Sequence, residues 1–495
     1  MAALGALAAA IVVFSTRHDP RLSPDSITYL SVARHLRSGE GITDFTGDPL
    51  TIFPPLYSML LAPGGTSLVW VRVVSAVLAA ASAVLLFWLL RHRVGRPVAI
   101  GATIAFSFSR GIVMISSFAW SELPALVLAL AVLVVLADRD RSTARWCVVA
   151  GVLAGMTFLT RYAGAGAIAA GGTVIVVAAW PGGRSRAIRL VGLFATAVVA
   201  VCAVWVIRNL VVVGQPLGPR FEGGTTESFD VLIRRPFRSI GQLVLGDDVE
   251  GEFALRTGLV VSALIVVGGA VFTRRDRRPI DAGVMVFAAA AFLLPVVARL
   301  ATSNDISPRV MAPVLLPLVY FAAVGTEGLL SLAKSPRRWV GRCGVGVASF
   351  VVAAVVWQGA TYASTFPDLA SSGSRRLYSP ELFDAIDELD PDATVITNNP
   401  WSVFWVNRRD PVLFGFVLPR SGNSHYPISA DRIARLACGG PTYLAWFPTF
   451  LRAGEVPRER LQDRFGLFDL VELRSVRKMA GGELSRVVPI GDACT

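Results

Sequence analysis

Asp25 is the residue of this sequence that is best placed to act as a general base. It lies in LSPDSITYLSVARHLRSGEG (22–41), which has the pattern of a short helix. Ser23 is a suitable N-cap, Pro24 fits the first helical position and Gly39 supplies a stop. The helix dipole stabilises a carboxylate in the first turn, and a general base must be ionised. The alternative is that Asp25 only stabilises this turn, and its spacing alone favours that interpretation.

Glu122, in FAWSELPALVL, is a second acidic candidate because it stands where a long apolar run begins. An ionisable side chain at that depth in a membrane is costly unless it is paired or functional. Five arginines stand at predicted helix ends on the same side: Arg110, Arg161, Arg208, Arg299 and Arg309. Each alone can be a snorkelling anchor, whereas together they would form a cationic rim for an anionic headgroup. Both interpretations stay open.

These residues must be positioned by membrane-spanning helices, since 54% of the 495 residues are hydrophobic and only 17% are charged. Soluble domains carry about 25% charged residues. About 20 apolar residues cross the hydrocarbon core, and the apolar runs therefore predict about eleven spans in an α-helical polytopic membrane protein. The predicted spans are 2–16, 68–90, 97–116, 121–137, 146–160, 163–180, 190–210, 256–273, 281–300, 310–332 and 343–361.

The basic residues predict the orientation of these spans. Arginine-rich stretches occur at every second loop, at 91–96, 138–145, 182–189, 274–279 and 334–342, and we expect these loops to be cytoplasmic. The first outer loop 17–67, the outer loop 211–255, the segment 302–309 and the tail after 362 must then face outward. The net charge of +12 follows largely from this arrangement and does not indicate nucleic-acid binding.

The helix that carries Asp25 and the C-terminal tail complete the outward side. Tyr29, Leu30, Ala33 and Leu36 give the helix one apolar side, which predicts an amphipathic helix on the outer membrane surface. In the tail, residues 393–414 suggest a strand, a helix from Pro400 and a return to extended chain, with further strands at 441–447 and 467–476. A small α/β domain is expected there. Its cysteines, Cys438 and Cys494, are consistent with a disulfide or with two free thiols.

Several stretches, in order, resemble the polytopic GT-C glycosyltransferases, in the branch related to protein O-mannosyltransferases and the lipid A aminoarabinose transferase. They are SPDSITYLSVARHLRSGEG, DPLTIFPPLYSMLLAP (48–63), AWSELPALVLAL, FLTRYAG (158–164), WVIRNLVVVGQPLGPR (205–220), DISPRVMAPVLLPLV (305–319) and VITNNPWSVFWVNRR, the last typical of actinobacterial-type members. Two departures concern substrate contacts. Ser26 follows Asp25 where many relatives have a second acidic residue, and Phe53 stands where a basic residue often precedes Pro-Pro.

The resemblance implies a GT-C transmembrane catalytic domain (1–361) and an extracytoplasmic α/β domain (362–495) in the plasma membrane. Asp25 would be the catalytic base and Glu122 the second acidic residue, while Arg161, Arg208 or Arg309 would bind the donor phosphate. The donor would be a polyprenyl-phosphate sugar, and the acceptor a hydroxyl of a cell-envelope glycan, lipid or protein, with inversion. No cofactor is implied, and the need for a divalent metal stays open.

Tyr29 and Tyr57 are further candidates for substrate binding. Interfacial anchoring is the alternative for Tyr57, as it is for Trp120 and Tyr162, because tyrosine and tryptophan favour the membrane boundary.

Two other classes of function compete with a transferase. A lipid or solute transporter would carry polar residues at mid-membrane and interrupted helices in repeated halves, and the sequence shows no internal repeat. A non-catalytic, glycan-binding relative of the transferases is the third possibility. The presence of both acidic residues, Asp25 and Glu122, argues against it. DRD (138–140) matches the DxD motif of soluble glycosyltransferases, but it lies in a predicted cytoplasmic loop.

Overall fold

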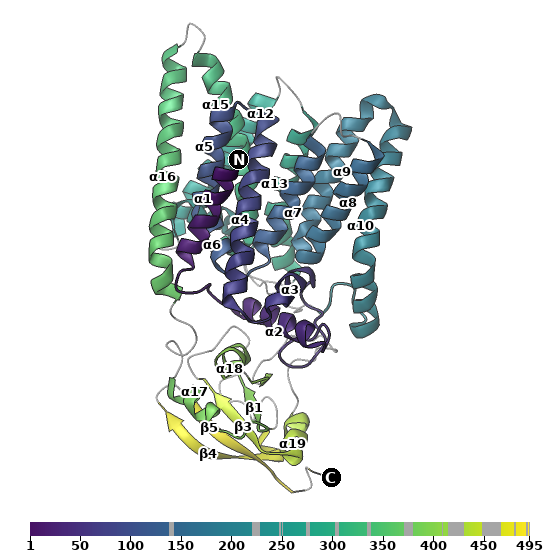
Figure 1. Cartoon of the computed structure of the whole chain (residues 1–495), viewed down its shortest axis with the longest axis vertical. Helices are drawn as coiled ribbons and strands as arrows, with labels where there is room; N and C mark the ends of the chain where they lie inside the picture. Colours follow the sequence, from purple (N-terminus) through teal and green to yellow (C-terminus); the bar gives the residue numbers. More distant parts are fainter. Residues whose placement is uncertain are drawn as a thin grey trace.

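The chain folds into a helical bundle followed by a small α/β unit (Figure 1). The computed structural model describes residues 1–137, 143–219, 228–246, 249, 251–273, 278–301, 306–333, 338–370, 380–407, 409–413, 430–447, 467–479, 482–491 and 494. The DRD motif lies outside these residues. The bundle helices are α1 (Ala2–Ser15), α2 (Pro24–Ser38), α3 (Leu56–Leu61), α4 (Leu68–Arg91), α5 (Arg96–Phe108), α6 (Arg110–Ser117), α7 (Glu122–Ala137), α8 (Ala144–Thr160), α9 (Ala165–Ala179), α10 (Arg184–Val213), α11 (Phe229–Leu245), α12 (Gly251–Thr273), α13 (Pro279–Ala301), α14 (Pro308–Met311), α15 (Leu315–Ala333) and α16 (Arg338–Ala370).

The long apolar helices make this a multi-pass membrane protein. Among the described residues, five helical segments are long and apolar enough to cross a membrane, and a sixth is the bent pair α5 and α6. The sequence predicted a single span over 97–116, and the structure divides this stretch into two helices with a bend of 52° between them. Ser109 at this break has the extended backbone ψ of 137°, which interrupts the helical hydrogen-bond ladder.

The helix that begins beside Asp25 forms as its end signals predict. Ser23 caps α2 by accepting from the Ser26 backbone N–H, and the Ser26 side chain accepts from Ser23 N–H in return. Gly39 ends the helix at a φ of +84°, a conformation that glycine adopts without strain.

The surface position predicted for α2 is wrong, because the helix is buried on most of its sides. Tyr29 and Leu30 pack with Tyr57 of α3 against the bundle. On another side, Ile27 packs with Phe404 of the α/β unit. A lipid-surface helix needs only one apolar side, whereas α2 lies between two parts of the protein.

The α/β unit contains a five-stranded sheet in the order β2-β1-β3-β5-β4. Its strands are β1 (Thr394–Thr397), β2 (Val412–Leu413), β3 (Thr442–Trp446), β4 (Val471–Met479) and β5 (Gly482–Pro489). The first three strands are parallel, and β5 is antiparallel to both β3 and β4. The sequence predicted β1, β3 and β4, but not β5 or the helix α19 (Ala430–Gly439).

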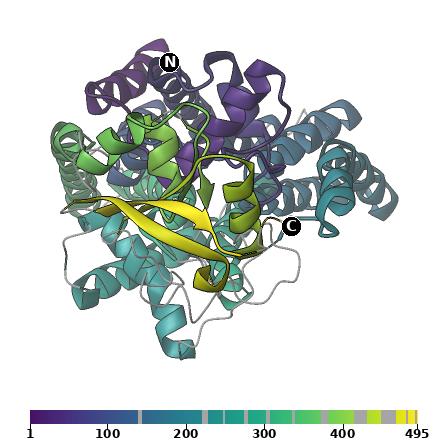
Figure 2. The same ribbon diagram turned by 90° about the horizontal axis from the view of Figure 1, so that it is seen from below.

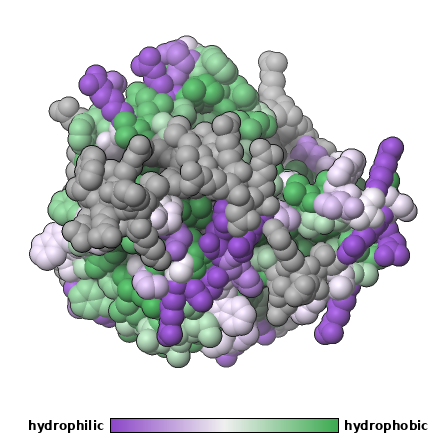
Figure 3. Space-filling model, turned by 90° about the horizontal axis from the view of Figure 1, so that it is seen from above, coloured by the Kyte–Doolittle hydropathy of each residue, from purple (hydrophilic) through white to green (hydrophobic). Residues whose placement is uncertain are grey.

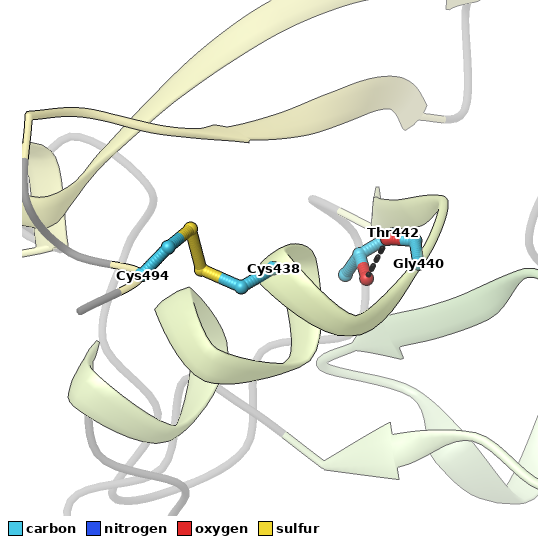
Figure 4. Close-up of a disulfide and its surroundings, with 4 residues drawn as sticks. All are labelled: Cys438, Gly440, Thr442 and Cys494. Atoms are coloured by element: carbon cyan, nitrogen blue, oxygen red, sulfur yellow. Dashed lines mark hydrogen bonds between the residues drawn. A yellow bond between two sulfur atoms is a disulfide. The ribbon is translucent and has the colours of Figure 1, made fainter.

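Helices cover both faces of this sheet. The helices α17 (Pro380–Asp387) and α18 (Pro400–Asn407) pack on the face of Val395 and Ala445. The helix α19 packs on the opposite face, over Ile396 and Leu444. A disulfide joins Cys438 at the end of α19 to Cys494 near the C-terminus, so the open alternative is resolved in favour of the bond (Figure 4).

The α/β unit lies at the end of the bundle that carries α2 and α3 (Figure 1), and it covers the middle of that end when seen from below (Figure 2). Phe404 of α18 packs on Phe45, with ring centroids 6.0 Å apart. The Arg34 guanidinium stacks on the Phe404 ring and pairs with Asp410. The unit is therefore docked next to α2, the helix that carries Asp25 in its first turn.

The opposite end of the bundle is shown in Figure 3, where hydrophilic side chains in purple lie among apolar ones. The junction of α4 and α5 and the start of α10 lie at this end (Figure 1). Their exposed arginines are Arg91, Arg96, Arg184, Arg186 and Arg189. The predicted cytoplasmic loops 91–96 and 182–189 are thus at the end farthest from the sheet.

Candidate active site

A buried carboxylate, Glu122, forms the centre of the candidate site. It is the first residue of α7, and its side chain is 0% exposed. Arg161, at the end of α8, donates from Nη1 to Glu122 Oε1 at 2.7 Å. Arg309 of α14 donates from Nε to the same oxygen and from Nη2 to Oε2 at 3.4 Å. Two guanidinium groups therefore compensate the burial of this charge, as a buried carboxylate requires.

Arg309 also holds Asp25, so that one guanidinium joins the two predicted acidic residues. Its Nη1 lies 2.7 Å from Asp25 Oδ2. The Asp25 side chain is 34% exposed, in contrast to the closed Glu122. Asp25 comes from the start of α2, Glu122 from α7 and Arg309 from α14, so three segments distant in sequence converge at this end of the bundle. The Asp25 carboxylate therefore stays accessible, and its ion pair with Arg309 fixes its orientation.

The Trp120 ring packs against the Arg309 guanidinium and helps to hold it in place. Arg309 lies 4.1 Å above the centre of the indole ring, a cation–π geometry. The indole Nε1 donates to Ser23 Oγ at 2.7 Å, which ties the ring to the cap of α2. Trp120 is only 7% exposed. Interfacial anchoring is therefore the wrong role for this residue; its position directly before Ser121-Glu122 was the signal for a site residue.

Tyr29 and Tyr57 form a layer behind the acidic residues. Both rings are almost fully buried and meet edge to face, with centroids 5.1 Å apart. The Tyr29 hydroxyl lies 3.0 Å from Ser121 Oγ. Burial raises the pKa of Tyr29 well above its usual value, and the nearby charges of Asp25 and Glu122 raise it further, so the phenol stays neutral. In this structure the two rings support the acidic residues from behind, and their role in substrate binding stays a prediction.

The cationic rim predicted from five arginines does not form as one group. Arg161 and Arg309 meet at Glu122, but Arg208 donates instead to the backbone carbonyls of Leu50 at 2.7 Å and Ile42 at 3.3 Å. It thereby fixes the first loop. Arg110 stacks on the ring of Tyr362, 4.4 Å from its centre. A sequence shows that arginines stand at helix ends, but not toward which neighbour each side chain turns.

The chemistry available here is that of an oriented carboxylate beside a fixed cation. Asp25 can accept a proton from a hydroxyl, and Arg309 can stabilise negative charge that develops next to it. Across the described part of the chain, no group of three or more histidine, cysteine, aspartate or glutamate residues is arranged to hold a metal.

Comparison with solved structures identifies the fold. ArnT from Cupriavidus metallidurans is similar over 98% of this chain and 97% of its own, with a TM-score of 0.65 and 16% identity in its apo state, and a TM-score of 0.63 and 14% identity when bound to undecaprenyl phosphate. The chain has the GT-C fold. No family model and no curated protein matches the sequence itself.

Two further GT-C glycosyltransferases share this fold. The archaeal oligosaccharyltransferase AglB from Archaeoglobus fulgidus, in complex with an inhibitory peptide and a dolichol-phosphate, has a TM-score of 0.51 at 11% identity over 90% of this chain and 69% of its own. The arabinofuranosyltransferase AftD from Mycobacteria has a TM-score of 0.54 at 14% identity over 99% of this chain and 40% of its own. The GT-C resemblance of the sequence is thus confirmed at the level of the fold.

Proposed function

We propose that this protein is an inverting membrane glycosyltransferase that moves a sugar from a polyprenyl phosphate to a hydroxyl of a cell-envelope glycan, lipid or protein. The observation that carries the proposal is the bridge of Arg309 between the accessible Asp25 and the buried Glu122. The fold supports it, since ArnT has been solved with undecaprenyl phosphate and AglB with a dolichol-phosphate. The reaction needs a base, positive charge for the leaving phosphate and a lipid-anchored donor, and Asp25 and Arg309 are placed to supply the first two.

Asp25 is the general base in this mechanism. It takes the proton of the acceptor hydroxyl as the oxygen attacks the anomeric carbon of the sugar, and the bond from that carbon to the phosphate oxygen breaks. The leaving phosphate gains negative charge, which Arg309 is placed to stabilise. Glu122 does not touch the reacting atoms; with Arg161 it holds the Arg309 fork in place. A phosphate leaves without a general acid because it is already a weak base.

The proposed orientation places the site outside the cytoplasm. The arginine-rich loops 91–96 and 182–189 lie at the end away from the sheet, as the positive-inside rule requires of cytoplasmic loops. The disulfide of Cys438 and Cys494 belongs in an oxidising compartment. We therefore take residues 1–361 as a transmembrane catalytic domain with about eleven spans and residues 362–495 as an extracytoplasmic domain of a plasma-membrane protein.

The test is a transfer assay with purified protein in lipid vesicles. Polyprenyl-phosphate hexoses and pentoses are supplied with cell-envelope extracts as acceptors, and release of polyprenyl phosphate is measured for wild type and for Asp25→Asn. Asparagine keeps the shape but is a far weaker base, and we expect a loss of about 10²–10⁴-fold.

Asp431→Asn is the matched control, because Asp431 also lies in the first turn of a helix, α19, away from the site. It should transfer at the wild-type rate. Equal turnover by wild type and Asp25→Asn would remove Asp25 from the mechanism. Binding of donor without any turnover by wild type would instead favour the non-catalytic, glycan-binding alternative.

A further inference from the structure

An open cavity of about 550 Å³ lies beside the candidate site and is lined by arginines of α11. Arg234, Arg235 and Arg238 share it with Ser307 and Pro308. These last two residues directly precede Arg309, the guanidinium that holds both carboxylates. None of these α11 arginines was singled out from the sequence, which predicted only that the loop 211–255 faces outward.

The helix α11 is built to present these arginines on one side. Arg234, Arg238 and Gln242 are four residues apart and line the cavity, while Leu232, Ile240 and Leu243 are buried against the bundle. The Ser239 hydroxyl donates to the Ile306 carbonyl at 3.1 Å, which fixes α11 to the segment that leads to Arg309. The cationic side of α11 is therefore held at the edge of the candidate site.

The charges of the acidic cluster show why a further cation is needed. Asp25 and Glu122 are balanced by Arg161 and Arg309, so the described cluster is neutral before a donor binds. A polyprenyl-phosphate sugar brings about one negative charge, and the monoester left after transfer carries about −1.5 to −2 at pH 7. Glu252 also lines the cavity, but it pairs with Arg256 at 3.2 Å. The three arginines of α11 supply the additional positive charge that the neutral cluster of Asp25, Glu122, Arg161 and Arg309 lacks.

We propose that the α11 cavity binds the phosphate group of the lipid-linked donor through Arg234 and Arg238, with Arg235 adding to the field. This inference rests on the proposed function and extends it: Arg309 stabilises charge next to the reacting atoms, and α11 selects and holds the anionic headgroup. Guanidinium groups suit this task because they donate two hydrogen bonds to one phosphate in a fixed geometry.

A binding assay tests the cavity without requiring turnover. Full-length protein in detergent is incubated with a fluorescent polyprenyl phosphate, and unlabelled polyprenyl phosphate, polyprenol of the same length and phosphatidylglycerol are compared as competitors. We expect wild type to prefer the phosphate over the alcohol by about tenfold or more. The double variant Arg234→Gln with Arg238→Gln should lose most of that preference, and Arg238→Lys should keep part of it.

Arg189→Gln is the matched control, since Arg189 is an exposed arginine at the other end of the bundle. Arg234 and Arg238 are also exposed. If the double variant has a lowered melting temperature, the single variant Arg234→Gln replaces it in the assay. Wild-type affinity in the folded variants would overturn the inference, as would equal competition by phosphatidylglycerol. Asp25→Asn should still bind the phosphate. If wild type binds the phosphate but does not transfer a sugar, only the proposed function is contradicted. If the double variant transfers with the wild-type KM for the donor, only phosphate binding in the cavity is contradicted.

Discussion

Two buried groups of charged residues, at opposite ends of the bundle, use the same residue types in different ways. At the end away from the sheet, Asp281 accepts from Tyr320 at 2.7 Å and lies 3.2 Å from Arg93 Nε. The Asp281 and Arg93 side chains are 6% and 8% exposed, so this group is closed. At the other end, Asp25 is 34% exposed although it shares Arg309 with a fully buried carboxylate.

The difference separates a structural ion pair from a reactive one. A closed pair stabilises the packing of helices only because both partners are present, and it has no room for a ligand. A pair with one accessible oxygen and a fixed partner can receive a hydroxyl without rebuilding the site. The variants below test this comparison by changing, in turn, the arginine bridge, the buried carboxylate, the disulfide of the α/β unit and the ring beneath the bridge.

The largest effect is expected for Arg309→Lys. A lysine ammonium lacks the planar fork that reaches Asp25 and Glu122 together, and it also loses contact with the Trp120 ring. The transfer rate should fall by about 10²–10³-fold, measured as release of polyprenyl phosphate under saturating donor. Arg189→Lys should leave that rate unchanged. A rate for Arg309→Lys close to wild type would show that the bridge is only structural.

Glu122→Gln tests the buried half of the site. Loss of this carboxylate leaves Arg161 and Arg309 without their shared counter-charge, and the free energy of unfolding should fall by about 3–5 kcal/mol. Thermal unfolding in detergent measures the effect. The control is Glu472→Gln, because Glu472 pairs with Arg474 on the surface and its loss should not change the melting temperature. Equal melting temperatures for Glu122→Gln and wild type would contradict the described network.

Removal of the disulfide tests whether the α/β unit depends on its own bond. Serine at both Cys438 and Cys494 should cost the unit about 2–4 kcal/mol. Faster amide exchange in α19 and the sheet, with little change in α4 and α7, is the expected readout. Reducing agent should have no further effect on this variant. Equal loss of protection in the bundle would mean that the two parts unfold together.

Trp120→Phe is the mildest change. Phenylalanine keeps a ring beneath Arg309 but cannot donate to Ser23. Loss of one hydrogen bond should raise the activation free energy by about 1 kcal/mol, roughly fivefold in rate. A loss as large as that of Arg309→Lys would show that the indole itself touches the substrate.

The sequence was sufficient for the parts of the fold that local patterns determine. Apolar runs of membrane length predicted the helices, and Ser23 and Gly39 predicted both ends of α2. The β5 strand was missed because GELSRVVP does not alternate cleanly between apolar and polar residues and gains its place by pairing with β3 and β4. The burial of α2 was missed because it depends on the α/β unit docking against it.

Local patterns were less informative about the site. Asp25 and Glu122 were predicted from their places at helix starts, and the structure brings both to Arg309. The partner of each arginine depends on tertiary packing: Arg208 turns to the carbonyls of the first loop. The arginines of α11 were missed because nothing in the local sequence distinguishes a cavity wall from a solvated surface.

The most direct test compares Asp25→Asn with Asp281→Asn in one preparation. Single-turnover transfer and thermal unfolding are measured for both variants beside wild type. We predict that Asp25→Asn keeps its melting temperature and loses transfer, whereas Asp281→Asn melts earlier and transfers normally while folded. The reverse pattern, or transfer by both variants at the wild-type rate, would contradict the assignment of the Asp25 end of the bundle as the active site.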